Sequence, residues 1–229
     1  MKETQNLPIG ERVAVATPAC EPAATVHTGT YVQLRPIDPA ADAPLLFDSS
    51  HGDAHDWIWT YMPYGPFPGR SEMTDWLEEI SSSSDPRFYT VCRQADQQPV
   101  GIVSFLRIDA DHRCIEVGHI WYVPQVQRSE VNTESLYLLL KHAFDDLGFR
   151  RVEWKCDALN ARSKAAALRL GFKAEGVFRQ HRIVRGRNRD TAWFALLDHE
   201  WPAIRAHFET WLAAPATARP SLTALNRTA

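Results

Sequence analysis

A strand-like run, a polar turn and an amphipathic helix follow one another between residues 115 and 147. From Leu136 to Leu147 the apolar residues recur at spacings of three and four, which is the period of a helix with one buried face. The turn before the helix, QRSEVNTE (127–134), is polar apart from Val131. Such a turn presents backbone N–H groups and the positive end of a helix dipole together. The segment therefore favours a mixed α and β fold, with either an anion-binding turn or an ordinary polar connection.

The remaining periodic segments extend this α+β interpretation. Alternating apolar residues predict strands at 31–36, 88–94, 100–108, 115–123 and 152–158, and two further strands within 177–197 around the turn RGRNRD. Helical spacing predicts helices at 40–49, from Ser71, at 132–147, from Asn160 to Gly171, and at 199–212. The expected order is β-α-α-β-β-β-α-β-α-β-β-α, with a mixed sheet.

Length and composition predict one domain with two extensions. The chain has 229 residues, of which 45% are hydrophobic and 23% charged, enough for one substantial core. The Pro- and Ala-rich residues 1–28 are interpreted as a loose N-terminal arm, residues 29–212 as the domain, and residues 213–229 as a tail.

Charge, hydropathy and cysteine spacing exclude several functional classes. A net charge of −3 gives no reason to expect a nucleic-acid partner. No apolar run of about 18 residues predicts a membrane span, and the N-terminus lacks the apolar core of a signal peptide. The four cysteines form no CxxC pair, and the nine histidines show no metal-ligand spacing with them. We expect reduced thiols in a cytoplasmic protein without a bound metal.

The segment NARSKAAALRLGF (160–172), together with the turn at 127–134, resembles the signatures of the GNAT N-acetyltransferase superfamily. The supporting runs are IEVGHIWYVPQVQRSEVNTE, RVEWKCDALNARSKAAALRLGFKAEGVFRQH and GRNRDTAWFALLDHEWP, about half of the chain. The branch that they resemble most includes bacterial acetyltransferases of ribosomal-protein N-termini. The resemblance implies a single domain with a mixed, mostly antiparallel sheet flanked by helices, in a monomer or homodimer.

The resemblance also implies acetyl-CoA as co-substrate and assigns residues to it. In the family a turn of the form Q/R-x-x-G-x-G/A wraps the diphosphate. Here that turn supplies Arg128, Ser129, Glu130, Val131, Asn132 and Thr133, while Trp121, Tyr122, Val123 and Asn160 are expected along the thioester and pantetheine. The two usual glycines are replaced by Arg128 and Glu130. We expect Glu130 to face solvent, so that the amides of residues 128–133 bind the diphosphate.

The acid that protonates the leaving thiolate is predicted to be Ser163. Many family members use a tyrosine where this chain has Ala167. The ribosomal-type branch uses a serine three residues after the asparagine, which here is Ser163. The alternative interpretation is that Ser163 only caps its helix.

Candidates for the base lie on the strand that enters the polar turn. Strict alternation places Glu116 and His119 on opposite faces, but a bulge at Gly118 would bring both to one side. The alternatives are a surface glutamate and a packed histidine. His181 is a weaker candidate, and a water chain is another.

The aromatic segment HDWIWTYMPYGPFPG (55–69) is the candidate acceptor pocket, because its three prolines and two glycines bar a long regular element. Its predicted walls are Trp57, Trp59, Tyr61, Tyr64 and Phe67. Such walls suit an aliphatic or cationic amine. Core packing of an irregular connection explains them equally well.

The sequence thus favours transfer of an acetyl group from acetyl-CoA to a primary amine, either a protein N-terminus or a small molecule. The missing tyrosine and glycines leave open a catalytically idle module that binds or senses acyl-CoA. An interaction domain that merely keeps the fold is the third hypothesis.

Overall fold

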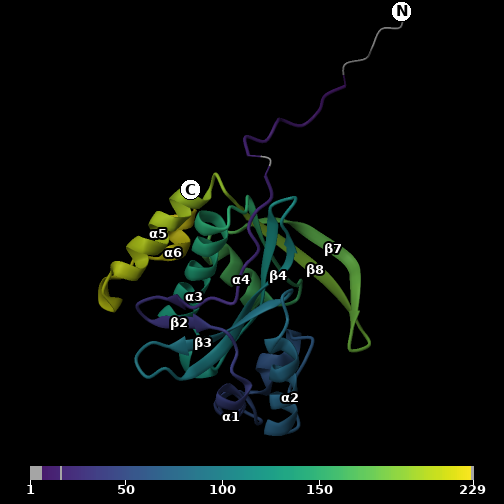
Figure 1. The fold of residues 1–229 in the computed structure, drawn as a ribbon, viewed down its shortest axis with the longest axis vertical. Coiled ribbons are helices and arrows are strands. Elements are labelled where there is room, and N and C mark those ends of the chain that lie inside the picture. Colours follow the sequence, from purple (N-terminus) through teal and green to yellow (C-terminus); the bar gives the residue numbers. More distant parts are fainter. Residues whose placement is uncertain (1–6, 16, 228–229) are drawn as a thin grey trace, which may run out of the picture.

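The computed structural model describes residues 7–15 and 17–227, and in them eight strands form one sheet in the order β1-β2-β3-β4-β5-β6-β8-β7 (Figure 1). The strands are β1 His27–Thr28, β2 Val32–Arg35, β3 Arg87–Arg93, β4 Pro99–Asp109, β5 Cys114–Tyr122, β6 Arg151–Asp157, β7 Lys173–Val184 and β8 Arg187–Leu197. All neighbouring strands are antiparallel except β5 and β6, which are parallel. The expected mixed, mostly antiparallel sheet is confirmed.

Six α-helices and four short helical turns complete the described part of the chain. The α-helices are α1 Pro39–Ser50, α2 Arg70–Ser81, α3 Glu130–Lys141, α4 Ala161–Arg169, α5 Trp201–Ala213 and α6 Leu222–Asn226. Short 3₁₀-helical segments lie at Asp56–Tyr61, Pro124–Val126 and Ala216–Ala218, and a π-helical turn at His142–Asp146 extends α3.

The two faces of the sheet are covered by different helices, as successive residues of β3 demonstrate. Phe88 contacts Trp76 of α2, whereas its neighbour Tyr89 packs toward His27, which contacts His142 beyond α3. Since neighbouring side chains of a strand point to opposite faces, α2 and α3 lie on opposite sides of the sheet. α5 and α6 pack beside α3 and α4. We call the side of α1 and α2 the front face.

Most element boundaries agree with the sequence pattern, and the exceptions have local causes. α3 begins at Glu130, two residues earlier than predicted, because the Ser129 side chain accepts a hydrogen bond from the amide of Val131 and acts as N-cap. The turn between β7 and β8 is shorter than predicted, because β8 resumes at Arg187.

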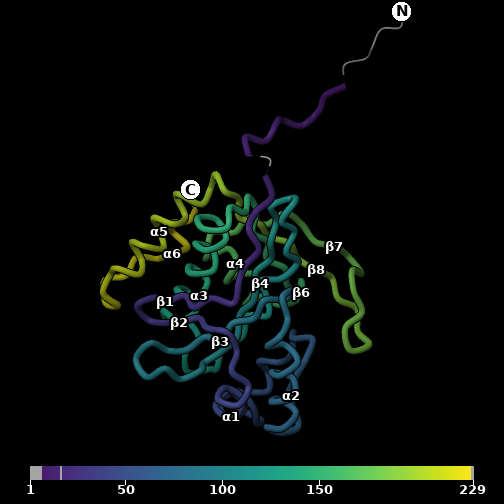
Figure 2. The backbone as a smooth tube through the Cα atoms, in the orientation of Figure 1, coloured from purple at the N-terminus to yellow at the C-terminus, as the bar shows by residue number. Residues whose placement is uncertain are grey.

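The two terminal extensions contact the domain to different degrees. Residues 7–15 extend away from the sheet (Figure 2), whereas the amides of Ala19 and Cys20 bond to Ala110 and Leu147. The C-terminal residues contain α6, whose Leu222 is buried. Of the predicted arm and tail, residues 1–6, 16 and 228–229 lie outside the described residues.

The cysteines and the lengths of the helices can be compared with what composition led us to expect. All four cysteines are free thiols: Cys92 and Cys156 are buried, Cys114 is half-buried and Cys20 is exposed. Within residues 7–15 and 17–227, no helix is both long and apolar enough to cross a bilayer.

Candidate active site

The parallel strands β5 and β6 lose their pairing halfway along. Their register covers only Cys114, Ile115 and Glu116, opposite Arg151, Val152 and Glu153. Beyond that point β5 continues to Tyr122 and β6 to Asp157 without bonding to each other. Backbone groups on the facing edges of residues 117–122 and 154–157 are therefore left for another partner. We call this region the β5–β6 split.

A bulge in β5 brings both predicted bases to the front face. Ser104 of β4 pairs with Gly118 and Ile102 pairs with Trp121, so that Val103 stands opposite two residues of β5. His119 lies in the bulge and has a positive φ of 51°. Its ring contacts Phe88 and Tyr64, which belong to the front face. Glu116 lies on the same face, because Phe88 is in register with Ser104 and Ser104 with Gly118, and Glu116 is two residues from Gly118 on β5. The structure thus contains a bulge next to Gly118, which the sequence made possible but did not require.

The predicted diphosphate turn has the conformation that a glycine would favour. Arg128 has φ of 62°, in the left-handed region where non-glycine residues cost about 1–2 kcal/mol. Next to it, the Ser129 hydroxyl accepts from the amide of Val131 at 3.2 Å and donates to Val126 O at 2.6 Å. The other amides of the first helical turn have no intrahelical acceptor by helix geometry. The turn thus keeps its shape although the usual glycine is absent.

Glu130 is half-buried, with 27% of its side chain exposed, and it is paired rather than directed freely into solvent as expected. Its carboxylate forms an ion pair with Arg219, which lies between α5 and α6. Arg219 in turn lies 4.4 Å from the centre of the Trp211 ring and donates to Tyr31 Oη at 3.1 Å. The arginine lowers the pKa of Glu130, chiefly by this hydrogen bond. The acidic side chain beside the turn is therefore neutralised by the C-terminal segment rather than by water.

Arg169, at the end of α4, reaches the same helix start and was not singled out from the sequence. Its guanidinium donates to Asn132 Oδ1 at 3.0 Å and to Thr133 Oγ1 at 2.9 Å. The side-chain oxygens of these two predicted ligands are thus engaged by Arg169. The only sequence signal was the position of Arg169 in the last turn of a helix, where basic residues are common.

Of the three β5 amides predicted to bind the thioester arm, that of Val123 is not available. It donates to Val100 O at 2.9 Å and so belongs to the β4 side. Backbone groups of successive residues point to opposite edges of a strand, and those of residues two apart point to the same edge. Trp121 therefore shares the direction of Val123, while Tyr122 directs its amide to the β5–β6 split.

The start of α4 positions Ser163 beside β6. Asn160 is the N-cap, and its Oδ1 accepts from the amide of Ser163 at 3.0 Å. The Trp154 indole donates to Ser163 Oγ at 3.0 Å. Because the indole N–H can only donate, the Ser163 hydroxyl can still act as a donor itself, and it also interacts with the Cys156 thiol. The predicted Asn160 cap is confirmed.

His119 lies in an apolar setting that keeps it neutral. Tyr64 stacks on its ring at 5.6 Å between ring centres, and Tyr64 Oη lies 3.3 Å from His119 Nδ1. Burial lowers the pKa of His119 to about 4. At neutral pH the imidazole is therefore neutral, and the lowered pKa makes it a weaker base than an exposed histidine.

Glu116 is held in a buried ion cluster. Its Oε2 lies 3.0 Å from Lys155 Nζ and 3.1 Å from Arg107 Nε, and Lys155 also pairs with Glu153. Burial raises the pKa of Glu116, while Lys155 and Arg107 oppose this shift. Protonating Glu116 would break two ion pairs, which makes it a poorer proton acceptor than its burial alone implies.

The aromatic segment divides into a packed part and an exposed part. Trp59 has no exposed surface and donates to Ser50 O, so it does not belong to the predicted pocket wall. Tyr64 and Phe67 pack under it around Trp76.

Trp57 and Tyr61 are the members that remain exposed, at 41% and 39%. Tyr61 donates to Leu159 O at 3.3 Å, and Arg162 lies over the Trp57 ring at 4.4 Å. Trp57 and Tyr61 therefore contact the start of α4, close to Ser163.

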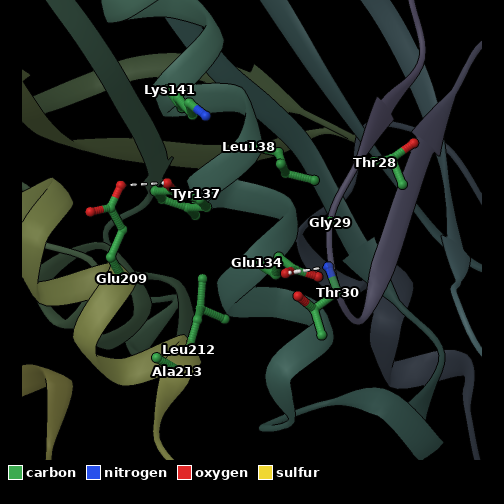
Figure 3. Close-up of a pocket in the computed structure, with 10 residues that line it drawn as sticks. All are labelled: Thr28, Gly29, Thr30, Glu134, Tyr137, Leu138, Lys141, Glu209, Leu212 and Ala213. Carbon is green, nitrogen blue, oxygen red and sulfur yellow. Dashed lines mark hydrogen bonds between the residues drawn. The ribbon is translucent and has the colours of Figure 1, made fainter.

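Two hollows lie elsewhere on the molecule. The one drawn in Figure 3 has a volume of about 400 Å³ and lies between the β1–β2 turn, α3 and α5. Its acidic groups are occupied. Glu134 accepts from the amides of Thr30, Tyr31 and Val32 at 2.5–2.9 Å. A Cβ at Gly29 would lie 2.4 Å from the Glu134 Cδ, so this turn requires glycine. The other, near Phe67 and Pro68, has a volume of about 640 Å³. Neither contains Ser163 or the diphosphate turn.

No cluster of three or more His, Cys, Asp or Glu able to hold a metal ion occurs among residues 7–15 and 17–227.

Comparison with known proteins gives the family of this chain. The family described as "Acetyltransferase (GNAT) domain" matches residues 32–173. The chain belongs to the GNAT acetyltransferase family. A crystal structure of a GCN5-related N-acetyltransferase from Brucella melitensis is 36% identical with a TM-score of 0.88, over 92% of this chain and 98% of that one. The matched residues include β5, the predicted diphosphate turn and α4.

Two other similar proteins have names or bound ligands that describe an activity. The ribosomal-protein-serine acetyltransferase of Escherichia coli K12 is 31% identical over 85 residues, 37% of this chain and 47% of the relative. The chain spans about half the length of such curated relatives. The microcin C7 self-immunity acetyltransferase MccE, solved with acetyl-CoA and AMP, shares the fold at 21% identity and a TM-score of 0.65, over 74% of this chain and 93% of that one.

Proposed function

We propose that this GNAT protein transfers the acetyl group of acetyl-CoA to a primary amine, with a protein N-terminus as the favoured acceptor. Ser163 carries this proposal: at the start of α4 its hydroxyl accepts from the Trp154 indole, its amide donates to Asn160 Oδ1, and the hydroxyl can itself donate. A hydroxyl held in this way at a helix start can donate to a leaving thiolate. The E. coli relative's name, a ribosomal-protein-serine acetyltransferase, supports the choice of acceptor.

The donor is expected to lie along the β5–β6 split. The amides of the turn at 128–133 bind the diphosphate, and the dipole of α3 favours that negative charge. The amide of Tyr122 bonds the pantetheine arm or the thioester carbonyl. Asn160 directs its NH₂ group to the same arm, since only its Oδ1 is used in capping.

Acetyl transfer then needs one proton removed and one supplied. The neutral amine attacks the thioester carbonyl and the C–S bond breaks. Ser163 donates a proton to the departing sulfur and regains one from the attacking nitrogen, which loses its second proton as the amide forms. We assign proton removal from the incoming ammonium to His119, which is neutral and lies on the front face with the aromatic segment. Glu116 holds Lys155 in place and is the second candidate.

Two measurements test the proposal and separate it from an idle acyl-CoA-binding module. Calorimetric titration with acetyl-CoA should give saturable binding. Thiol release with a panel of peptides and small amines should then show turnover, with peptides preferred. Binding without turnover for any acceptor would leave the idle module, and absence of binding would leave only an interaction domain.

A further inference from the structure

The hairpin of β7 and β8 has a concentrated positive charge that neither the fold nor acetyl transfer requires. Its residues 176–190 include five arginines, Arg179, Arg182, Arg185, Arg187 and Arg189, and the single acid Asp190. We call residues 176–190 the arginine hairpin. None of the five arginines has an ion-pair partner within 4.0 Å in the described part of the chain. The whole protein has a net charge of −3, so this charge is local.

The arginine hairpin shares its inner face with the candidate catalytic groups. Arg182 and Arg189 are cross-strand partners, and alternate residues place Trp193 on the same side as Arg189. Trp193 is the cross-strand partner of Lys155, which pairs with Glu116. The chain of cross-strand neighbours therefore runs from the hairpin to the front face near His119.

Two buried donors on this face have no acceptor among the described residues: Nε of Arg189 and Nε1 of Trp193. Beside them, His181 bonds to Thr191 Oγ1 at 2.9 Å. Burial lowers the pKa of His181, and the charges of Arg182, Arg189 and Lys155 lower it further. Arg182, Arg189 and the Trp193 indole thus place donors close together without an ion-pair partner or acceptor among the described carboxylates, whereas Lys155 is already paired with Glu116 and Glu153. This arrangement fits an anionic ligand group.

The hairpin also has apolar side chains and an unpaired edge. Val177, Phe178 and Ile183 are 52%, 54% and 83% exposed. β7 is the last strand of the sheet, so one edge of its backbone has no strand partner. At its tip, the guanidinium of Arg185 donates to Gly65 O in the aromatic segment, which ties the hairpin to the candidate acceptor pocket. Figure 1 shows β7 and β8 as the long curved strands that extend past the helices.

We propose that the arginine hairpin docks an acidic segment of the polypeptide whose amine is acetylated. This inference rests on the proposed acetyl transfer and names its substrate class. An extended peptide can use the free edge of β7 while its carboxylates pair with the arginines and its apolar side chains cover Phe178 and Ile183. A second copy of the chain would bring five arginines against five and be repelled. A nucleic acid would match the charge but leave the exposed apolar side chains unused.

The test compares two labelled peptides that begin with the same serine, one followed by four Glu and the other by four Gln. Fluorescence anisotropy in the presence of CoA gives Kd, and thiol release with acetyl-CoA gives KM. The acidic peptide should bind about tenfold more tightly at low salt, and this advantage should shrink as ionic strength rises. Arg182→Gln combined with Arg189→Gln should reduce it to about threefold or less.

Arg150→Gln removes one charge at an exposed site just before β6 and is the matched control for the single-charge variant Arg187→Gln. Arg187→Gln, at the exposed hairpin turn, gives a second hairpin variant that does not depend on the buried donors. Unchanged thermal unfolding of each variant verifies the fold.

Equal affinity for the two peptides would overturn the docking proposal, and so would tighter binding of a single-stranded RNA oligonucleotide that displaces the acidic peptide. Thiol release with the neutral peptide would then still uphold acetyl transfer. Conversely, an acidic preference in anisotropy without thiol release from any peptide would support the surface and refute the transfer.

Discussion

Arg219 and Glu130 form an ion pair across 89 residues of sequence, which joins the C-terminal segment to the first residue of α3. Glu130 stands where the family has a glycine, beside the predicted diphosphate turn. An unpaired carboxylate there would repel the donor's phosphates.

Arg219→Gln should therefore weaken acetyl-CoA binding by about threefold to tenfold, because the variant leaves the Glu130 charge exposed to the diphosphate. Glu130→Gln in the same chain should restore the affinity, since both charges are then gone. Calorimetric titration of the two single variants and the double variant measures this coupling. If the double variant binds as weakly as Arg219→Gln, the ion pair does not act through the charge of Glu130.

Ser163→Ala should lower kcat by about 10²–10⁴ while changing the Kd for acetyl-CoA less than threefold, because the hydroxyl acts on the departing thiolate. Trp154→Phe should give a smaller loss, since it removes the bond that orients Ser163. Ser81→Ala, at the exposed end of α2, is the control. A Ser163→Ala enzyme with the parent's turnover would leave the serine as a cap only.

His119→Ala should change the acidic limb of the rate–pH profile more than Glu116→Gln does, because Glu116 is already held by two cations. Both variants should still bind acetyl-CoA, as neither side chain lies at the diphosphate turn. The profile is recorded for two acceptors of different amine pKa. A limb that follows the acceptor and ignores both variants would mean that the protein supplies no base from β5.

Acid should destabilise the fold through His27 and His119, each of whose pKa is lowered by burial from 6.5 to about 4. Between these values the unfolded state binds more protons than the folded state, so the free energy of unfolding falls as pH decreases from 6.5 to about 4. For His27, the neighbouring His142 adds to the effect and Asp146 opposes it.

Urea unfolding at pH 7, 5.5 and 4.5 measures this loss for the parent, His27→Gln and His119→Gln. Each variant should lose less stability across the window than the parent does. His199→Gln serves as the control, because that side chain is 72% exposed. A parent whose stability is constant over this range would contradict the prediction.

Local patterns in the sequence determined most of the architecture, because their causes act over a few residues. The alternation in 152–158 predicted β6, and Asn160 predicted the start of α4, since its side chain needs only the amide three residues on. The left-handed conformations of Gly148 and Gly171 end helical segments for the same short-range reason. The motif spacing also indicated the GNAT family and the diphosphate turn.

Tertiary structure alone decided which candidate groups are free to act. The sequence could not reveal that Val100 occupies the amide of Val123, that Trp59 is fully buried, or that Arg169 bonds Asn132 and Thr133. The bulge at His119 depends on how β4 and β5 align, and the Arg219–Glu130 pair depends on where the C-terminal segment packs. Such contacts join residues far apart in the chain, so they exist only after the sheet and helices have assembled, and no local propensity encodes them.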